Sequence, residues 1–395
     1  MISAVSITHQ SSLNEAAEAA TSAGVFGIDT EFMRERTYRA QLCLVQMASP
    51  DKISLTDPLQ KLDLSPIASL LADPEVEVVL HAGRQDLELF HDEFKVVPSN
   101  VFDVQVAAGF AGFGASLSYG ALVKNVLGVT LVKGESYTDW CRRPLTDKQM
   151  EYAADDVRWL LDAAAALKKR LRELGRLEWA LEEMKVLSAE GTYKLDLDEV
   201  WRRVSGRGTL SGKQLAVLRE VARWREEKAM SRNLPRGWLV KDATLVEIAR
   251  RQPTSLEKLG RIRGFNAREL GKSGAEIIKA VERGRNGEAP NVPPAPRRED
   301  QVRTRLIGGL ADVVVRTRAE AAGIAPELVA TRGDVESLLL RLFAGKSTDA
   351  ADNGDHRLLQ GWRRELVGDA VVALAEGRLG VKGIDRSPFI EEVEV

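Results

Sequence analysis

The sequence is poor in cysteine and histidine, and it has no long run of apolar residues. Its two cysteines, Cys43 and Cys141, form neither a disulfide framework nor a zinc-ligand pattern, and they favour a reducing cytoplasm. No segment approaches the roughly 18–20 apolar residues that span a bilayer. The N-terminus lacks a basic stretch before an apolar core, so it does not read as a secretory signal. We therefore expect a cytoplasmic protein without a membrane segment.

Charge is distributed unevenly along the chain, although the net charge is only −2. Lys+Arg and Asp+Glu number 20 and 31 in residues 1–200, a balance of −11. They number 21 and 10 in residues 201–290, a balance of +11, and 15 and 17 in residues 291–395, a balance of −2. The basic middle block suggests a polyanionic partner, although a solvated, arginine-rich helical surface would give the same count.

Strand-like and helix-like segments alternate over residues 1–175, which predicts a mixed α/β domain. The expected strands are 25–32, 40–48, 52–56, 76–81 and 100–103, and the expected helices are 65–71, 84–94, 117–127 and 147–174.

Strand signals fade after residue 175. The expected order is a helical connector (176–207), a helical domain (208–288), a proline-rich linker (289–300) and a second, divergent helical domain (301–395). Residues 220–250 and 312–341 both read as a long helix, a break with one proline and a second helix. They form a weak internal repeat.

Two carboxylates, Asp29 and Glu31, stand two residues apart in the first expected strand, so they project from the same face. The neighbouring Phe26, Ile28 and Phe32 point to the other face, toward the core. Like charges that are partly buried need a cation, or one of them must take up a proton. A solvent-facing edge strand would also explain the pair.

Further acidic residues occur at Asp86, near the start of an expected helix, and at Asp156 in a later helix. Tyr152 lies four residues before Asp156, so both occupy one helix face, while Asp155 points about 100° away. Oxygen ligands without His or Cys clusters favour Mg²⁺ or Mn²⁺. Four carboxylates can hold two such ions about 3.5–4 Å apart for attack on phosphodiesters.

Three segments, GIDTEF, HAGRQDLELF and YAADDV, resemble the exonuclease motifs of the DEDD superfamily, and Tyr152 matches its tyrosine subclass. The flanking segments TYRAQLCLVQMA and SYTDWCRRPLTDKQMEYAADDV are similar to the ribonuclease D family. Residues 210–265 resemble a helicase-and-RNase-D C-terminal (HRDC) domain, and the last hundred residues resemble a second one loosely. The combination of motifs carries the resemblance, which covers most of the chain.

This resemblance implies an α/β RNase H-like exonuclease core, with a mixed central sheet flanked by helices, followed by two all-α HRDC-type domains. It implies a metal-dependent 3′→5′ exoribonuclease that releases nucleoside 5′-monophosphates from single-stranded RNA 3′ ends, with tRNA precursors as expected substrates and no obligate protein partner. The resemblance assigns two Mg²⁺ or Mn²⁺ ions to Asp29, Glu31, Asp86 and Asp156, and the orientation of the attacking water to Tyr152.

Contacts with RNA are expected from residues near the three motifs, although strand alternation points Thr30 and Phe32 toward the core. The candidates are Thr30, Phe32, His81, Arg142 and Arg143. In the basic block, Arg232, Trp238 and Lys241 lie near a proline-containing break, and Trp238 is expected in the core. The sequence leaves open a single-stranded DNA exonuclease, which contact with a 2′-hydroxyl would distinguish, and a nuclease-dead nucleic-acid-binding protein.

Overall fold

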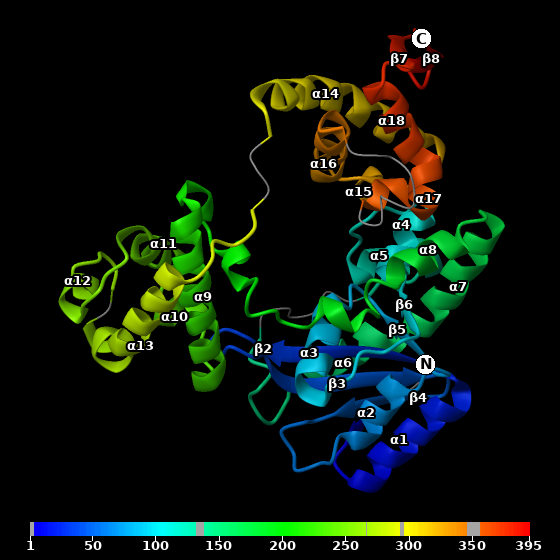
Figure 1. Cartoon of the computed structure of the whole chain (residues 1–395). Helices are drawn as coiled ribbons and strands as arrows, with labels where there is room; N and C mark the ends of the chain where they lie inside the picture. Colours follow the sequence, from blue (N-terminus) through cyan, green and yellow to red (C-terminus); the bar gives the residue numbers. More distant parts are fainter. Residues whose placement is uncertain (1–3, 132–137, 266, 293–295, 346–355) are drawn as a thin grey trace.

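Six strands form one mixed sheet in the first part of the chain (Figure 1). The structure is a computed structural model that describes residues 4–131, 138–265, 267–292, 296–345 and 356–395. The strand order is β1-β4-β3-β2-β5-β6, in which β3 runs antiparallel to β2 and β4 while the other neighbours are parallel. The strands are β1 (Ala4–Ile7), β2 (Val25–Met33), β3 (Gln41–Ser49), β4 (Lys52–Thr56), β5 (Glu77–Leu80) and β6 (Val101–Asp103).

Helices cover both faces of this sheet, which confirms the expected α/β core of a mixed sheet flanked by helices. One layer packs on a core that includes Phe26, Ile28 and Phe90, and the other on a core that includes Leu44 and Leu160. The first layer is α1 (Gln10–Ala23), α2 (Ser65–Ala72) and α3 (Arg84–Phe94); the second is α4 (Val104–Phe110), α5 (Tyr119–Leu127), α6 (Asp147–Arg158) and α7 (Leu160–Glu173).

The helix expected over 147–174 is broken into α6 and α7 at Trp159, whose ψ of 3° leaves the helical region. Gly27 of β2 allows α7 to lie close to the sheet, since a Cβ there would stand 3.1 Å from the Leu160 side chain. This close approach sets the start of α7 against the first part of β2.

The two cysteines are bonded to each other, contrary to the expectation from their number and spacing. Cys43 of β3 and Cys141, in the segment before α6, form a disulfide with a Cα–Cα distance of 5.2 Å. A separation of 98 residues in sequence gave no sign of this contact, because the fold alone brings β3 and that segment together. Because both cysteines are paired, they no longer support the expectation of a reducing compartment.

The middle of the chain is a separate helical unit with its own core, which includes Trp201, Leu218 and Ile277. The connector to it contains α8 (Leu177–Met184) and the short turns η1 (Glu190–Thr192), η2 (Val200–Arg203) and η3 (Arg207–Thr209). The unit is built from α9 (Gly212–Arg232), α10 (Arg236–Leu239), α11 (Asp242–Arg251), α12 (Leu256–Gly260) and α13 (Ala267–Asn286).

The last part of the chain is mainly helical, but it is not all-α as expected. Its final strands, β7 (Leu379–Gly383) and β8 (Ile390–Glu394), pair as an antiparallel hairpin, and Leu379 and Val381 pack against the core. Only Leu379 and Val381 of β7 show the two-residue spacing of a strand, and Ile390 and Val393 of β8 are three residues apart, so the sequence signal for this hairpin is weak. The helices are α14 (Arg298–Ala321), α15 (Pro326–Val329), α16 (Arg332–Phe343), α17 (Gly361–Arg363) and α18 (Asp369–Ala375), with the turn η4 (Arg357–Leu359) and the π-helical turn η5 (Arg364–Gly368).

The order of helices in α9-α10-α11 recurs in α14-α15-α16, in the segments where the sequence indicated a weak repeat. In each set a long helix precedes a four-residue helix and then a helix of 10 or 12 residues. Between the sets, α13 ends at Asn286, two residues before the expected end of its domain at 288, and α14 begins at Arg298, inside the expected linker 289–300. Its residues 293–295 lie outside the described residues.

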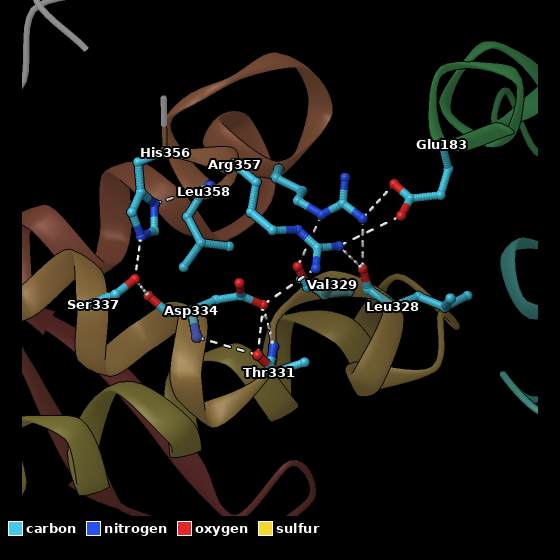
Figure 2. Close-up of polar contacts among 10 residues, drawn as sticks. Glu183, Leu328, Val329, Thr331, Asp334, Ser337, His356, Arg357 and Leu358 are labelled. Atoms are coloured by element: carbon cyan, nitrogen blue, oxygen red, sulfur yellow. Dashed lines mark hydrogen bonds and ion pairs between the residues drawn. The ribbon is translucent and has the colours of Figure 1, made fainter. Parts of the chain in front are cut away.

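The C-terminal helices pack directly on the α/β core. The Trp362 ring stacks on Trp179, with centroids 5.4 Å apart, and meets the edge of Phe110 at 5.1 Å. Glu183 of α8 accepts a hydrogen bond of 2.5 Å from Arg363 and lies 3.5 Å from Arg357 (Figure 2). The chain thus returns to its first domain after the separate middle unit (Figure 1).

No helix in the described part of the chain is long and apolar enough to cross a membrane.

Candidate active site

Asp29 and Glu31 lie on β2, in the interior of the sheet, between β3 and β5. Their partners across the antiparallel pair are Gln46 and Leu44 of β3, whose side chains share the same face. Leu44 belongs to the core beneath the α4–α7 layer, so both carboxylates face that layer. The strand alternation expected from the sequence is confirmed at these positions.

Asp86 reaches the same place from α3, on the opposite helix layer, and is 7% exposed. The start of α3 is anchored by Asp103, which accepts hydrogen bonds from the backbone N–H of Ala82 (3.2 Å) and Gly83 (3.0 Å). The Thr30 hydroxyl donates a hydrogen bond to the Asp86 carboxylate. Thr30 is only 6% exposed, so its visible role is to hold Asp86 in place.

Helix α6 contributes Asp156 and Tyr152, which share one face as expected. A capping box between Thr146 and Gln149 fixes the start of this helix. Tyr152 and Asp156 lie close enough for each to shift the pKa of the other. Asp155 instead accepts a 2.7 Å hydrogen bond from Arg158, so the structure distinguishes the two neighbouring aspartates.

The pKa values of all four carboxylates are raised, mainly by their removal from solvent, and charges within the cluster add to the rise at Asp29 and Glu31. Burial, followed by the charges of Asp86, Asp156 and Glu31, raises the pKa of Asp29 well above its usual value. Burial and the charges of Asp156 and Asp86 raise the pKa of Glu31 to about 8. Burial is also the main cause that raises the pKa of Asp156 to about 7 and that of Asp86 to about 6. Such a cluster of acids binds protons or cations readily.

Gln46 adds an unusual polar group beside Asp29. Its side chain is wholly buried, and neither its amide nitrogen nor its amide oxygen has a hydrogen-bond partner among the described residues. A buried amide without a hydrogen bond lowers folding stability by about 1–3 kcal/mol. We therefore infer that the Gln46 amide bonds a polar group that binds beside Asp29. Within the described ranges, however, no three His, Cys, Asp or Glu side chains already form a ready-made metal site.

Tyr119 is a further polar residue of the site, and no motif or spacing in the sequence indicated it. Its hydroxyl accepts a 3.2 Å hydrogen bond from the Trp159 N–H, at the break between α6 and α7. Burial, together with the charges of Asp156 and Asp29, raises the pKa of the Tyr119 hydroxyl. Tyr119 therefore helps to fix the end of α6, where Asp156 is located.

The other predicted contacts with RNA fall into different environments. Phe32 packs against the core of the α1–α3 layer, and the His81 ring nitrogen Nε2 lies 3.0 Å from the Leu117 carbonyl oxygen. Arg142 is exposed. Arg143 uses all five of its N–H groups on Asp57 and on backbone carbonyls, including that of Cys43, so it anchors its segment and has no donor left for RNA.

In the middle unit, the expectation for Trp238 is wrong. Its side chain is 60% exposed rather than in the core, because the four-residue helix α10 presents it outward while Leu239 is buried. Arg232 is engaged with Glu269 at 2.9 Å and Ser273 at 3.0 Å. Lys241 is exposed.

The C-terminal region contains a serine–histidine contact that resembles a nucleophile and its base (Figure 2). The Ser337 hydroxyl oxygen lies 2.7 Å from His356 Nε2. However, His356 Nδ1 accepts a hydrogen bond from the Leu358 N–H, so the proton of the neutral ring is on Nε2, which donates to Ser337. His356 therefore cannot take a proton from this serine, and the contact ties α16 to η4.

The raised pKa values predict that the metal-free protein loses stability as pH rises. A carboxyl group whose pKa is higher in the folded state stabilises the fold below its unfolded pKa, and this contribution is lost as pH rises through the folded pKa. The pKa of Glu31 is raised to about 8 and that of Asp156 to about 7. The metal-free protein should therefore lose folding stability between about pH 4 and pH 8.

The check is denaturant unfolding with EDTA at several pH values, for the wild type and Glu31→Gln. The variant should be the more stable protein at about pH 8, by at least about 1 kcal/mol, and this advantage should shrink toward pH 5. An advantage that stays constant with pH would contradict the assignment.

Comparison with known proteins agrees with this architecture. Residues 4–172 match the family model described as 3′-5′ exonuclease, and residues 214–281 match the HRDC domain. Ribonuclease D of Nitrobacter hamburgensis is 40% identical, over 90% of this chain and 91% of that protein. Ribonuclease D of Cronobacter turicensis is 34% identical, over 94% of this chain and 99% of that protein. The chain also superposes on the crystal structure of Escherichia coli RNase D, which is described as an exoribonuclease involved in structured RNA processing. The TM-score is 0.82 at 32% identity, over 95% of this chain and 99% of that chain. This chain belongs to the ribonuclease D family of 3′-5′ exoribonucleases.

Proposed function

We propose that Asp29, Glu31, Asp86 and Asp156 form the catalytic centre, that they hold two divalent ions, and that the substrates are the 3′ ends of structured RNAs such as tRNA precursors. The observation that supports this most strongly is that β2, α3 and α6 bring these carboxylates together, so that the charges of Asp86 and Asp156 raise the pKa values of both Asp29 and Glu31. Burying four acids together is costly unless a positive charge joins them.

The residues fit divalent ions by their chemistry. All four side chains offer carboxylate oxygens, which suit Mg²⁺ or Mn²⁺, and Gln46 offers an unpartnered amide beside Asp29. Binding would require the carboxylates to turn toward common points, and the Thr30 hydroxyl that now bonds Asp86 would share that carboxylate. When bound, the ions would supply Lewis-acid stabilisation of the phosphate oxygens and lower the pKa of water.

Tyr152 acts in this proposal by position rather than as a base. Burial, followed by the charges of Asp156, Glu31 and Asp29, raises the pKa of its hydroxyl, so the phenol keeps its proton at working pH. A protonated phenol can donate to a neighbouring carboxylate such as Asp156, and the lone pairs of its oxygen can accept a hydrogen bond from water. Tyr152 can thereby orient a water molecule toward the terminal phosphodiester.

Gln46 gives a direct test of the polar environment around Asp29. Gln46→Leu should raise the stability of the metal-free protein by about 1–3 kcal/mol, because it removes an unsatisfied buried amide. The same change should lower divalent-ion affinity or activity by about 10- to 100-fold. Denaturant unfolding in EDTA and Mn²⁺ titration measure the two effects, and unchanged Mn²⁺ affinity and activity would remove Gln46 from the site.

The alternatives from the sequence are separated by one incubation. The protein is mixed with 3′-hydroxyl RNA and with single-stranded DNA of the same sequence, in Mg²⁺, Mn²⁺ or EDTA. We expect 5′-mononucleotides from RNA, only with a divalent ion, and faster than from DNA. Faster release from DNA would favour the DNA exonuclease, and nucleic-acid binding without hydrolysis would favour the nuclease-dead protein.

A further inference from the structure

A basic groove lies where the α/β core, the connector and the middle helical unit meet. This junction groove has a volume of about 580 Å³, and its lining comes from the loop after β2, α3, residues 192–195, η2, the end of α9 and the start of α10. Two acidic residues, Glu88 and Asp92, contribute to the lining. Six basic residues outnumber them: Arg34, Arg39, Arg84, Lys194, Arg203 and Arg236.

Three of these basic side chains are available to a ligand. Arg39, Arg84 and Arg203 are exposed and have no ion-pair partner within the described ranges. By contrast, Arg34 pairs with Glu88 at 2.8 Å, and Arg236 pairs with the buried Glu226 at 2.7 Å. A groove that holds several cations without partners is complementary to an anion with more than one charge.

The groove is held in shape by a contact between the α/β core and the middle unit. Asn233, at the end of α9, accepts hydrogen bonds of 3.1 Å from the backbone N–H groups of both Tyr38 and Arg39. The Tyr38 hydroxyl donates to Glu226, and the Arg236 guanidinium lies over the Tyr38 ring. Because Glu226 is only 2% exposed, these contacts fix the middle unit against the loop that carries Arg39.

The junction groove adjoins the carboxylate cluster along two elements. Arg84 stands two residues before Asp86 on α3, and Arg34 stands three residues after Glu31, just past the end of β2. None of the four carboxylates lines the groove, so it is a neighbouring site and not the catalytic centre itself. A chain with one phosphate per nucleotide could end at the carboxylates and continue past these arginines.

We propose that the junction groove binds the sugar–phosphate backbone of the RNA upstream of the nucleotide being removed. This inference rests on the proposed function, and it assigns to Arg39, Arg84 and Arg203 a substrate-binding role that does not read sequence. It also gives the middle unit a function, because its docking through Asn233 and Glu226 completes the groove.

The test reverses two charges that are remote from the carboxylates, in Arg39→Glu/Arg203→Glu. Substrates are an RNA trinucleotide and an oligoadenylate of about 20 nucleotides, longer than the roughly 4–16 nucleotides that such grooves cover. We expect KM for the long RNA to rise at least about tenfold, with kcat and trinucleotide hydrolysis unchanged. The dependence of log affinity on log salt should become shallower by at least about 0.7 for each cation removed.

The matched control is Lys169→Glu/Arg386→Glu, which makes the same change in net charge at exposed positions outside the groove. The milder variant Arg39→Gln/Arg203→Gln removes the two charges without reversing them. It should raise KM for the long RNA by a smaller factor, and it keeps the test valid if the charge-reversed variant does not fold. An unchanged KM for the long RNA, an equal loss on the trinucleotide, or an equal loss in the control would overturn the proposal.

Binding measured without catalysis keeps this proposal separate from the proposed function. Fluorescence anisotropy of the long RNA in EDTA should show the same loss in the groove variant even if the wild type hydrolyses nothing, a result that would count against the proposed function alone. Polyglutamate serves as the probe for an acidic protein partner. Loss of polyglutamate binding with unchanged RNA binding would overturn the assignment to RNA.

Discussion

Replacing Asp29 with asparagine should lower RNA hydrolysis by roughly 10³-fold or more while the protein stays folded. Asp29 is the carboxylate whose pKa responds to Asp86, Asp156 and Glu31 together, so it lies at the centre of the cluster. The amide keeps the size of the side chain but removes the charge that attracts divalent ions. Single-turnover release of 5′-mononucleotides measures the effect.

The matched control is Asp155→Asn, an identical change next to the cluster. Asp155 is bonded to Arg158 and not to Tyr152, so this variant should retain most of the wild-type rate. In EDTA, Asp29→Asn should be more stable than the wild type at about pH 8, because the variant no longer buries an acid there. Near-normal activity of folded Asp29→Asn would refute the assignment of the catalytic centre.

Tyr152→Phe should slow the chemical step by about 100-fold and leave divalent-ion affinity nearly unchanged. The phenylalanine ring keeps the packing against Trp140, whose ring centroid lies 6.0 Å away, but it removes the hydroxyl that lies near Asp156. Single-turnover rates at saturating metal, together with Mn²⁺ titration, separate the two effects.

The shape of the pH profile distinguishes positioning from proton abstraction. If Tyr152 only orients water, the profile of the variant should keep the wild-type shape at a lower rate, since the phenol never titrates at working pH. A single-turnover rate equal to that of the wild type would remove Tyr152 from the mechanism.

The sequence predicted those parts of the site that depend on local spacing. Two carboxylates at alternate positions of a strand must share a face, and Tyr152 and Asp156 at i and i+4 must share a helix face, and the structure has both arrangements. The bounds of β4 and α3 also agree with the expectation, because apolar periodicity marks them clearly.

Contacts between distant segments could not be predicted in the same way. Strand alternation pointed Thr30 away from Asp29, yet its hydroxyl reaches Asp86 on α3, because that helix covers the opposite face of the sheet. Arg143 was expected to bind RNA because it is a cationic residue near the third motif. Its guanidinium instead donates hydrogen bonds to Asp57 and to nearby backbone carbonyls. Nothing in the local pattern around Tyr38 indicates its partner Glu226, which is 188 positions away.

A crystal soaked in Mn²⁺ with a non-hydrolysable RNA 3′ end tests the central claim most directly. Anomalous scattering locates each ion independently of any assumption about its ligands. We predict two Mn²⁺ ions about 3.5–4 Å apart, bonded to oxygens of Asp29, Glu31, Asp86 and Asp156. Mn²⁺ sites elsewhere, with these carboxylates bonded to no ion, would contradict the account.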